Sequence, residues 1–588
     1  MSVIRRPAEL VLLATLGVSL AVAGCIQAEP TALGSAEERK AVCDYWPAKL
    51  SIPSKEERAF KLIAEAKCKN ALPELEKMFE NRSHRSKVLK CVRAIGDRSG
   101  SVPILKRALG DSRLAKQAAT LVGRWKIKSL VPQLLGILES EGREGDRLAA
   151  LDALLEMTDP AMHEDLLIKL AWTDLNVQNA KVNARAIRAL QGMKSKKAGP
   201  YLVVAAFLQG DGQSVYQVAR QALAALGKDA VGPLAKASQD KLEILKKVAG
   251  KARIPHWEWT TGQKIAQLLA DTLHEDAAIP LAKNFALSIG AMPIGVAGSP
   301  KEPLWIINQK NRLNIAHFGL GHIGSDAPAA VLEKLVRDES ADTIRQRLKA
   351  ARSLAYIGTT KALATLFRLW DTDSLYNPDA AADLKAGKKA QKKKKKKSKK
   401  KKGKGGNALF LGPLTLPLAL AVGPRELAAF DERMKAAGTM RCWTREGSKG
   451  RLCVQAYLKD PEVQSYLVGV RACKESVDCY LKELSNENKF RVIKAALILA
   501  RGLSKGKVVG NGLIGDKDAV IQALLARVKT TKPGDADIRR FIFMALTRLG
   551  NATTAQQIQE LAQLPNFQDA MWRFEIPAIV AALKTRGN

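Results

Sequence analysis

Short apolar patterns of helical spacing recur along most of this 588-residue chain. Segments 72–79, 102–109 and 131–138 each begin with an apolar residue followed by Pro, and carry apolar side chains two and six positions after the Pro. Pro suits the first turn of a helix, because its φ is already helical and its missing N–H would have no partner there. Side chains four positions apart share one face of a helix. The pattern therefore predicts three amphipathic helices, with weaker copies at Pro200, Pro233, Pro280 and Pro328.

A second pattern, rich in Ala and ending in an apolar residue and Gly, follows these segments. It ends at Gly96, Gly123, Gly227 and Gly358, and segments 491–502 and 539–550 fit the same template. Ala lets paired helices approach closely, and Gly adopts the left-handed conformation that ends many helices. Helix pairs that cannot bury their apolar faces alone stack on one another as an α-solenoid. We therefore predict an all-α fold, which agrees with an aromatic content of 5% and few strand-favouring runs.

The repeated helix pairs resemble HEAT repeats over residues 55–370 and again over 424–585. This resemblance implies a solenoid of antiparallel helix pairs, expected to be monomeric, whose curved surface binds proteins. A nonrepetitive helical domain is the alternative, but it would not explain prolines 30 and 29 residues apart with matching apolar offsets.

The N-terminus carries the features of a secretory signal. Arg5 and Arg6 precede an apolar run that ends in small residues and is too short to span a membrane. Residues 22–25, Val-Ala-Gly-Cys, resemble the lipobox of bacterial lipoproteins. The resemblance implies removal of residues 1–24, acylation of Cys25 (a palmitate-type anchor) and attachment to the membrane of the bacterial cell envelope, with Ile26 favouring the outer membrane. An ordinary signal peptide with a chance Cys is the alternative.

We predict five segments along the chain. They are a signal peptide (1–24), a tether with an N-terminal helix (25–54), a HEAT-like array (55–370), an insertion (371–423) and C-terminal HEAT-like repeats with local disulfides (424–588). In the insertion, residues 385–404 hold 14 lysines and neither Arg nor an acidic residue, so this tract is expected to be disordered. Residues 408–422 are apolar but contain Pro413 and Pro417, which predicts a segment tucked against the solenoid and not a membrane span.

The net charge of +37 favours anionic partners. The lysine tract lacks aromatic residues for base stacking and Arg for bidentate contacts, so it would act as a diffuse cation and not as a sequence-specific nucleic-acid binder. A solvated spacer is the alternative interpretation. The candidate contacts to anionic polymers or lipids are Lys392, Lys393, Lys394, Lys395, Lys396, Lys397, Lys399, Lys400, Lys401 and Lys402.

Seven cysteines besides Cys25 become disulfide candidates if the protein is exported. Cys442, Cys453, Cys473 and Cys479 allow three pairings, of which the local one joins Cys442 to Cys453 and Cys473 to Cys479. A zinc site is disfavoured because the spacings are not C-x2-C. The early group cannot pair completely and leaves one free thiol among Cys43, Cys68 and Cys91.

Motifs that would indicate catalysis are weak. Residues 319–324 match the dinucleotide pattern G-x-G-x-x-G, but they end a predicted helix instead of following a strand. The His-Glu-Asp triplets at 163–165 and 274–276 are similar to the metal-binding pairs of HEAT-like di-iron hydroxylases, which use four such pairs. At the predicted starts of helices, these carboxylates instead favour the helix dipole. We therefore predict no catalytic residue, cofactor or metal site.

The sequence as a whole predicts a lipid-anchored envelope scaffold that binds an unidentified protein partner through its solenoid. One alternative is an electrostatic binder of anionic envelope polymers or lipids that acts through the lysine tract. A metal-dependent HEAT-like enzyme is a third interpretation.

Overall fold

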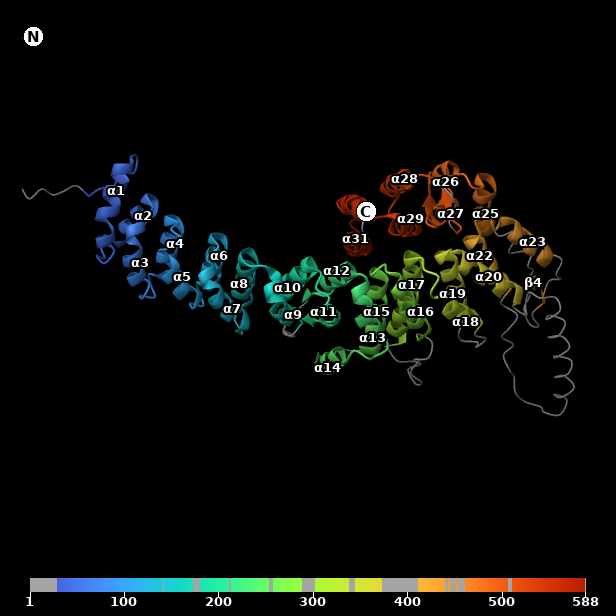
Figure 1. The fold of residues 1–588 in the computed structure, drawn as a ribbon, viewed down its shortest axis with the longest axis horizontal. Helices are drawn as coiled ribbons and strands as arrows, with labels where there is room; N and C mark the ends of the chain where they lie inside the picture. The colour runs from blue at the N-terminus through green and yellow to red at the C-terminus, as the bar shows by residue number, and fades with distance from the viewer. Residues whose placement is uncertain are drawn as a thin grey trace, which may run out of the picture. The chain divides into compact units, whose positions relative to one another are not determined.

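The computed structural model is helical in nearly every region that it describes (Figure 1). It describes residues 29–140, 142–172, 180–210, 213–252, 257–287, 302–337, 344–372, 411–438, 443–444, 451–452, 461–505 and 510–586. The strands in these ranges are two residues long. Two pairs are antiparallel, β1 (Gln209–Gly210) with β2 (Gln213–Ser214) and β3 (Trp443–Thr444) with β4 (Arg451–Leu452), and one is parallel, β5 (Leu503–Ser504) with β6 (Leu513–Ile514). The predicted all-α, HEAT-like solenoid is confirmed.

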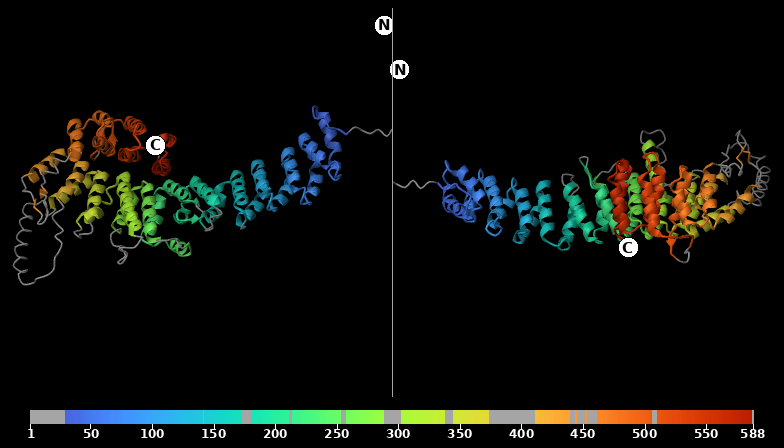
Figure 2. Two further views of the ribbon diagram at one scale, coloured as in Figure 1. Left: turned by 180° about the vertical axis from the view of Figure 1, so that it is seen from behind. Right: turned by 90° about the horizontal axis from the view of Figure 1, so that it is seen from above.

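The chain divides into two compact units, which we call unit 1 (residues 1–157) and unit 2 (158–588). In each, antiparallel helices stack side by side (Figure 2). Unit 1 contains α1 (Ala36–Tyr45), α2 (Glu56–Ala66), α3 (Leu72–Met78), α4 (Arg85–Ile95), α5 (Val102–Leu109), α6 (Ala115–Trp125), α7 (Val131–Glu139) and α8 (Glu144–Met157), with 3-10 turns η1 (Pro47–Lys49), η2 (Lys69–Ala71) and η3 (Lys128–Leu130).

Unit 2 begins with one series of helices that leads up to the lysine tract. These are α9 (Glu164–Trp172), α10 (Ala180–Met193), α11 (Gly199–Ala205), α12 (Tyr216–Leu226), α13 (Lys228–Ser238), α14 (Glu243–Ala252), α15 (Trp257–Asp271), α16 (Ala278–Leu287), α17 (Glu302–Ile323), α18 (Ala329–Arg337), α19 (Ile344–Ile357) and α20 (Thr360–Thr372), with η4 (Pro160–His163) and η6 (Glu275–Ala277).

A second series follows the tract. It comprises α22 (Leu411–Ala421), α23 (Leu427–Gly438), α25 (Pro461–Cys473), α26 (Val477–Glu483), α27 (Lys489–Leu499), α28 (Lys517–Lys529), α29 (Ala536–Leu549), α30 (Ala552–Leu561), η8 (Pro565–Phe567) and α31 (Ala570–Leu583). The second series returns to the first, because α31 packs on α12 and α15, and α29 packs on α17. Unit 2 therefore buries helix faces that an open solenoid would leave exposed.

The helices predicted at Pro73, Pro103 and Pro132 form as expected, whereas the prediction at Pro233 is wrong, because Pro233 lies inside α13 and does not begin a helix. Helices α3, α5 and α7 each begin at the residue before the Pro, and the predicted apolar face of each is buried, with Leu75, Leu105 and Leu134 at 0% exposure. Helix α4 ends at Gly96, whose φ of 73° is left-handed.

The prediction that Gly123 ends a helix is wrong. Helix α6 continues to Trp125, and the left-handed position is taken by Lys126, with φ 55°. A Cβ added at Gly123 would lie 2.8 Å from the Cα of Ala153, so this glycine permits the close approach of α6 and α8. Gly123 therefore allows α6 and α8 to pack closely and does not end a helix.

The interval 371–423, expected as an insertion, is partly helical. Helix α20 extends to Thr372, and residues 411–421 form α22 in spite of Pro417 in its interior. Leu414, Leu418 and Leu420 of α22 are buried, and the helix packs on α19, α20 and α25. This burial outweighs the hydrogen bond that Pro417 cannot donate. The tract at 385–404 lies outside the described residues.

None of the described helices is both long enough and apolar enough to cross a membrane.

Candidate functional site: a groove in unit 2

Positively charged side chains of the second helix series hold it against the first. Arg548 of α29 donates from Nε to the Gly321 carbonyl at 2.7 Å and from Nη1 to the Ile357 carbonyl at 3.0 Å. These carbonyls lie in the last turns of α17 and α19, where the helix leaves backbone acceptors unpaired and its dipole is negative. One guanidinium therefore caps two helices.

Lys494 and Arg586 act in the same way at two other helix ends. The Nζ of Lys494, whose residue is 1% exposed, donates to the carbonyls of Ala419 and Leu420 at 2.7 Å and of Val422 at 2.5 Å, at the end of α22. Arg586 donates from Nη2 to the Leu273 carbonyl at 2.9 Å, just after α15. Burial lowers the pKa of Lys494, but the three carbonyls favour its charged form. Arg548 and Arg586 thus join the two helix series, whereas Lys494 joins α27 to α22 within the second series.

The G-x-G-x-x-G motif is a packing feature of α17. A Cβ at Gly319 would lie 2.5 Å from the Cβ of Ala270 on α15, and one at Gly321 would lie 2.4 Å from the Cε of Met544 on α29. Gly324 ends the helix as predicted, with φ 67°. The first two glycines therefore let α17 lie close to helices on both of its sides.

Close to this contact, a buried ionic cluster joins three helices. Arg220 of α12 donates from Nε and Nη2 to the two carboxylate oxygens of Asp271 on α15, at 2.5 and 2.9 Å. The same Nη2 lies 2.7 Å from Oε2 of Glu575 on α31. Gln267 of α15 donates to Asp271 at 2.8 Å and to Glu575 at 3.5 Å. The guanidinium of Arg220 thus pairs with two carboxylates.

The members of this cluster differ in exposure and ionisation. The side chains of Arg220 and Asp271 are 3% and 6% exposed, whereas that of Glu575 is 32% exposed. Burial lowers the pKa of Arg220, but the charges of Asp271 and Glu575 outweigh it and raise that pKa above its ordinary value. Burial, together with the charge of Asp271, raises the pKa of Glu575 against the attraction of Arg220.

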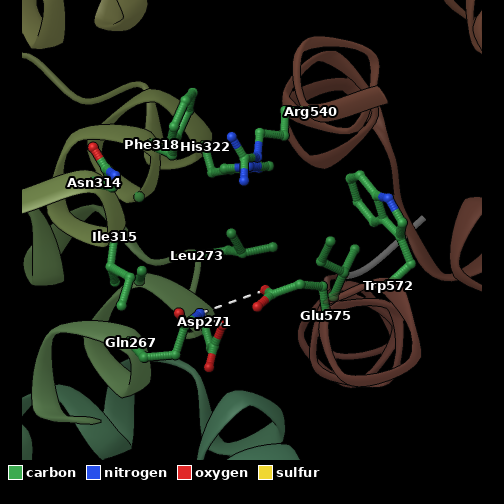
Figure 3. Close-up of a pocket in the computed structure, with 13 residues that line it drawn as sticks. Gln267, Asp271, Leu273, Asn314, Ile315, Phe318, His322, Arg540, Trp572 and Glu575 are labelled. Atoms are coloured by element: carbon green, nitrogen blue, oxygen red, sulfur yellow. Dashed lines mark hydrogen bonds between the residues drawn. The ribbon is translucent and has the colours of Figure 1, made fainter. Parts of the chain in front are cut away.

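Glu575 lines the first of two adjoining cavities, which we call the first cavity (Figure 3). It has a volume of about 150 Å³. Its walls come from α15, α17, α29 and α31, so both helix series contribute to it. Its charged end holds Asp271 and Glu575, and its apolar lining includes Leu273, Ile315, Phe318, Trp572 and Ile579.

The second cavity, of about 380 Å³, adjoins the first, and both are lined by Asn314, Phe318 and Arg540. We call the two cavities together the groove. The second cavity combines an excess of positive charge with five aromatic side chains. Its cations are Lys349, Arg352, Lys489 and Arg540, its carboxylates are Glu462 and Asp537, and its aromatic residues are Phe318, Tyr356, Tyr466, Phe490 and Phe541.

The aromatic side chains form a connected wall. The ring centroids of Phe318 and Tyr356 are 5.7 Å apart, and those of Tyr356 and Phe541 are 4.9 Å apart. The guanidinium carbon of Arg540 lies 5.0 Å from the centroid of Phe318. Burial, followed by the charge of Arg352, lowers the pKa of Lys349. The second cavity is therefore a partly buried, electropositive site with stacked aromatic walls, which suits an anionic or aromatic group of a ligand.

The structure tests few of the residues predicted from the sequence. Cys473 and Cys479 form a disulfide between α25 and α26. Cys43 pairs with Cys68, and the third early cysteine, Cys91, is a buried thiol. Cys25, Cys442, Cys453 and the ten candidate lysines at 392–397 and 399–402 lie outside the described residues.

The two His-Glu-Asp triplets lie at helix starts, as predicted. Glu164 and Asp165 open α9, and Glu164 accepts a hydrogen bond from Ser195 Oγ at 2.6 Å. His274 caps η6 by accepting from the Asp276 N–H at 3.2 Å. Within the described ranges, no group of three or more His, Cys, Asp or Glu side chains is placed to hold a metal ion.

Sequence reasoning missed both the groove and the capping cations. A sequence signal was present for a second set of capping arginines. In this set an arginine recurs at the fourth residue of the second helix of three pairs. Arg147, Arg347 and Arg539 each donate to a carbonyl at or just beyond the end of the preceding helix, those of Leu138 (3.1 Å), Val336 (2.5 Å) and Thr531 (2.8 Å). No comparable signal marks the groove, whose walls come from distant parts of the sequence.

No known protein family matches the chain, and no curated protein matches it. Among solved structures the chain is similar to Kap121p bound to Nup53p, with a TM-score of 0.30 and 12% identity over 94% of this chain and 71% of that chain. It is also similar to the karyopherin Kap121p bound to the extreme C-terminus of the protein phosphatase Cdc14p (TM-score 0.30, 11% identity, 94% and 72% covered) and to Kap121p bound to Pho4p (0.30, 12%, 94% and 71%). These similarities are too low to indicate a function, and the fold assignment rests on the helices of this chain.

Proposed function

We propose that this protein is a non-catalytic, lipid-anchored scaffold of the bacterial cell envelope that binds a segment of a partner protein in the groove of unit 2. The observation that carries the proposal is the pair of adjoining cavities, of about 150 and 380 Å³, between the two helix series.

The lining of the groove favours a peptide segment with acidic and apolar side chains. The half-buried Phe318 and Phe490 offer rigid aromatic surface, which dominates binding energy at many interfaces. Tyr356 and Phe541 are buried and support the ring of Phe318. Arg352 and Lys489 are exposed at the same cavity and would attract carboxylates. We expect affinity to come from the aromatic wall and orientation from the cations.

An exported location is supported by the cysteine pairing. The Cys43–Cys68 and Cys473–Cys479 disulfides suit an oxidising compartment, because the cytosol keeps most thiols reduced. The signal-like residues 10–25 and the acylation candidate Cys25 favour a membrane anchor, and Ile26 favours the outer membrane.

The test is site-directed photo-crosslinking in solubilised envelopes. The crosslinking amino acid p-benzoylphenylalanine replaces Phe490, a half-buried wall residue of the second cavity, and in a control replaces the exposed Lys482 on α26. We expect one discrete protein to crosslink from position 490 and not from 482. Arg352→Glu with Lys489→Glu should abolish this crosslink, whereas Lys482→Glu with Lys517→Glu, the same change of charge at exposed positions, should leave it intact. A crosslink that survives the groove reversal would refute the proposal.

The alternative is an electrostatic binder of anionic envelope polymers or lipids, favoured by the 14 lysines at 385–404. Deletion of residues 385–404 separates the two functions. If the groove binds the partner, the crosslink from position 490 persists in the deletion at high salt. Loss of envelope binding with the deletion, or with salt alone, would favour the alternative.

A further inference from the structure

We propose that the first cavity is a subsite for an organic cation, the ammonium or guanidinium group of a lysine or arginine side chain in the bound partner, with Glu575 as its anchor. This inference rests on the proposed function of the groove and adds the chemistry of one end of it.

The buried cluster places two carboxylates around one guanidinium. Asp271 and Glu575 share Arg220 through contacts of 2.5 to 2.9 Å, and Gln267 adds amide hydrogens but no charge. Arg540 also lines this cavity, and its charge opposes the burial that raises the pKa of Glu575. A ligand cation at Glu575 would act in the same direction as Arg220 and Arg540 and would favour the ionised carboxylate.

Of the two carboxylates, Glu575 is the accessible one. Asp271 is almost fully buried, whereas the Glu575 side chain is 32% exposed and lines the first cavity. Figure 3 shows the Glu575 carboxylate directed toward Gln267 of α15, with the hydrogen bond between them dashed. Glu575 is thus the member of the cluster that a ligand entering the cavity can reach.

The remaining wall of the first cavity suits an aliphatic stem. Leu273, Ile315 and Ile579 provide an apolar lining beside the carboxylate, and Trp572 provides an indole ring. Lysine and arginine combine an aliphatic stem with a charged head, so the stem would lie on the apolar wall and the head at Glu575. A cation near an indole face gains further attraction.

The two cavities together then dictate the direction of the bound segment. The first cavity is acidic at Glu575. The second holds four cations against two carboxylates, and one of these cations, Arg540, lines both cavities. A segment with a basic side chain in the first cavity and acidic side chains in the second matches both charges. The reverse placement would bring like charges together at both ends.

The probe is butylguanidinium, which carries the head group and stem of arginine. The full chain is labelled with 5-fluorotryptophan, and the Trp572 resonance among the nine tryptophans is assigned by Trp572→Phe. We expect butylguanidinium to shift the Trp572 resonance saturably, and butyrate, of similar size and opposite charge, to leave it unchanged. Absence of a saturable shift in the wild-type protein would overturn the inference without any variant.

Variants of the carboxylate test whether Glu575 is the anchor. Glu575→Gln keeps the size of the side chain and should weaken butylguanidinium binding about tenfold or more. Glu560→Gln, at an exposed glutamate of α30, should leave binding unchanged. Glu575→Asp keeps the charge on a shorter stem and should retain binding at reduced affinity. Equal affinity in Glu575→Gln and wild type would overturn the assignment.

The outcomes separate this inference from the proposed function. A crosslink at position 490 that depends on Arg352 and Lys489, without butylguanidinium binding, would refute the cation subsite and leave the groove as a docking site. Butylguanidinium binding without a specific crosslink would support the subsite as a cation site and refute partner docking in the second cavity.

Discussion

At the scale of single residues, cationic side chains of unit 2 donate hydrogen bonds to the unpaired carbonyls at the C-terminal ends of helices. Arg548, Arg586 and Lys494 donate to carbonyls at the ends of helices far away in sequence. A buried carbonyl that loses its donor keeps its full desolvation cost. Each of these residues therefore stabilises a tertiary contact and a helix end together.

The first prediction concerns Arg548. Burial, followed by the charge of Arg501, lowers the pKa of Arg548 to about 9, so its guanidinium stays charged at neutral pH. Arg548→Ala leaves the carbonyls of Gly321 and Ile357 without this donor and should lower the free energy of unfolding by about 3 kcal/mol or more. Urea unfolding measures the change. Arg573→Ala, at an exposed arginine of α31, should change it by no more than about 0.5 kcal/mol. Equal effects of the two substitutions would contradict the capping role.

The second prediction is a pH dependence from His322. Burial, followed by the charges of Arg548, Arg540 and Arg586, lowers the pKa of His322 to about 3, and Nδ1 lies 2.9 Å from Thr547 Oγ1. The folded protein holds this histidine neutral, while the unfolded chain binds a proton below pH of about 6.5. The stability is therefore full above pH of about 6.5 and falls as the pH drops toward 3.

At pH 5.5 this one group should cost about 1.4 kcal/mol relative to pH 7.5. His322→Asn removes the titrating group, so the difference in unfolding free energy between these two pH values should shrink by about that amount. Urea unfolding of both proteins at both pH values measures it. The assignment fails if wild type and variant show the same pH dependence.

At the scale of helices, glycine positions in α17 set how closely its neighbours approach. A Cβ at Gly319 would meet the Cβ of Ala270 and Cδ2 of Leu281 at 2.5 and 2.9 Å, and the short Ala270 side chain cannot move aside. At Gly321 the nearest atom is the end of Met544, which is flexible. Gly319 is therefore the more restrictive of the two positions.

The third prediction compares two glycine substitutions. Gly319→Ala should lower the free energy of unfolding by about 1–3 kcal/mol through overpacking. Gly136→Ala on α7 should raise it by about 0.5–1 kcal/mol, because an added Cβ meets nothing within 4 Å and the unfolded chain loses freedom. Urea unfolding of both variants measures the two signs. A stabilising Gly319→Ala would show that α15 and α17 are not closely packed.

Local signals predicted most of the helices, and distant contacts explain what they did not predict. Pro73, Pro103 and Pro132 fix where α3, α5 and α7 begin, because the proline ring acts within one turn. Gly123 misled the prediction, since a glycine can serve close packing as well as a helix end. Glu575 and Arg220 are 355 residues apart, so no periodic pattern links them. The groove could not be foreseen for the same reason, whereas the recurring arginines could have been.

At the scale of the whole molecule, the return of α31 onto α12 and α15 makes α31 part of the core of unit 2. In an open solenoid, each repeat contacts only its neighbours, and removing a terminal repeat leaves the rest in place. Here Arg220 and Asp271, both buried, would lose the carboxylate and apolar surface of α31. Unit 2 should therefore unfold more cooperatively than an open repeat array.

The fourth prediction follows from this closure. Deletion of residues 569–588 should expose α12 and α15 and strip their backbone amides of most of their protection from hydrogen exchange. The amides of α2, α4 and α6 belong to unit 1 and serve as the internal control, because they should keep their protection. Hydrogen exchange followed by mass spectrometry measures both regions in one sample. Unchanged protection in α12 would contradict a structural role for α31.

The position of α31 also bears on how the protein is made. Ribosomes synthesise α31 after the other described helices of unit 2, so α12 and α15 emerge well before the helix that covers them. A product that stops before residue 575 lacks Glu575 and leaves the Arg220–Asp271 pair uncovered. Proteases act on such partly open chains. Copies that include α31 should therefore accumulate in the cell in preference to copies that stop before it.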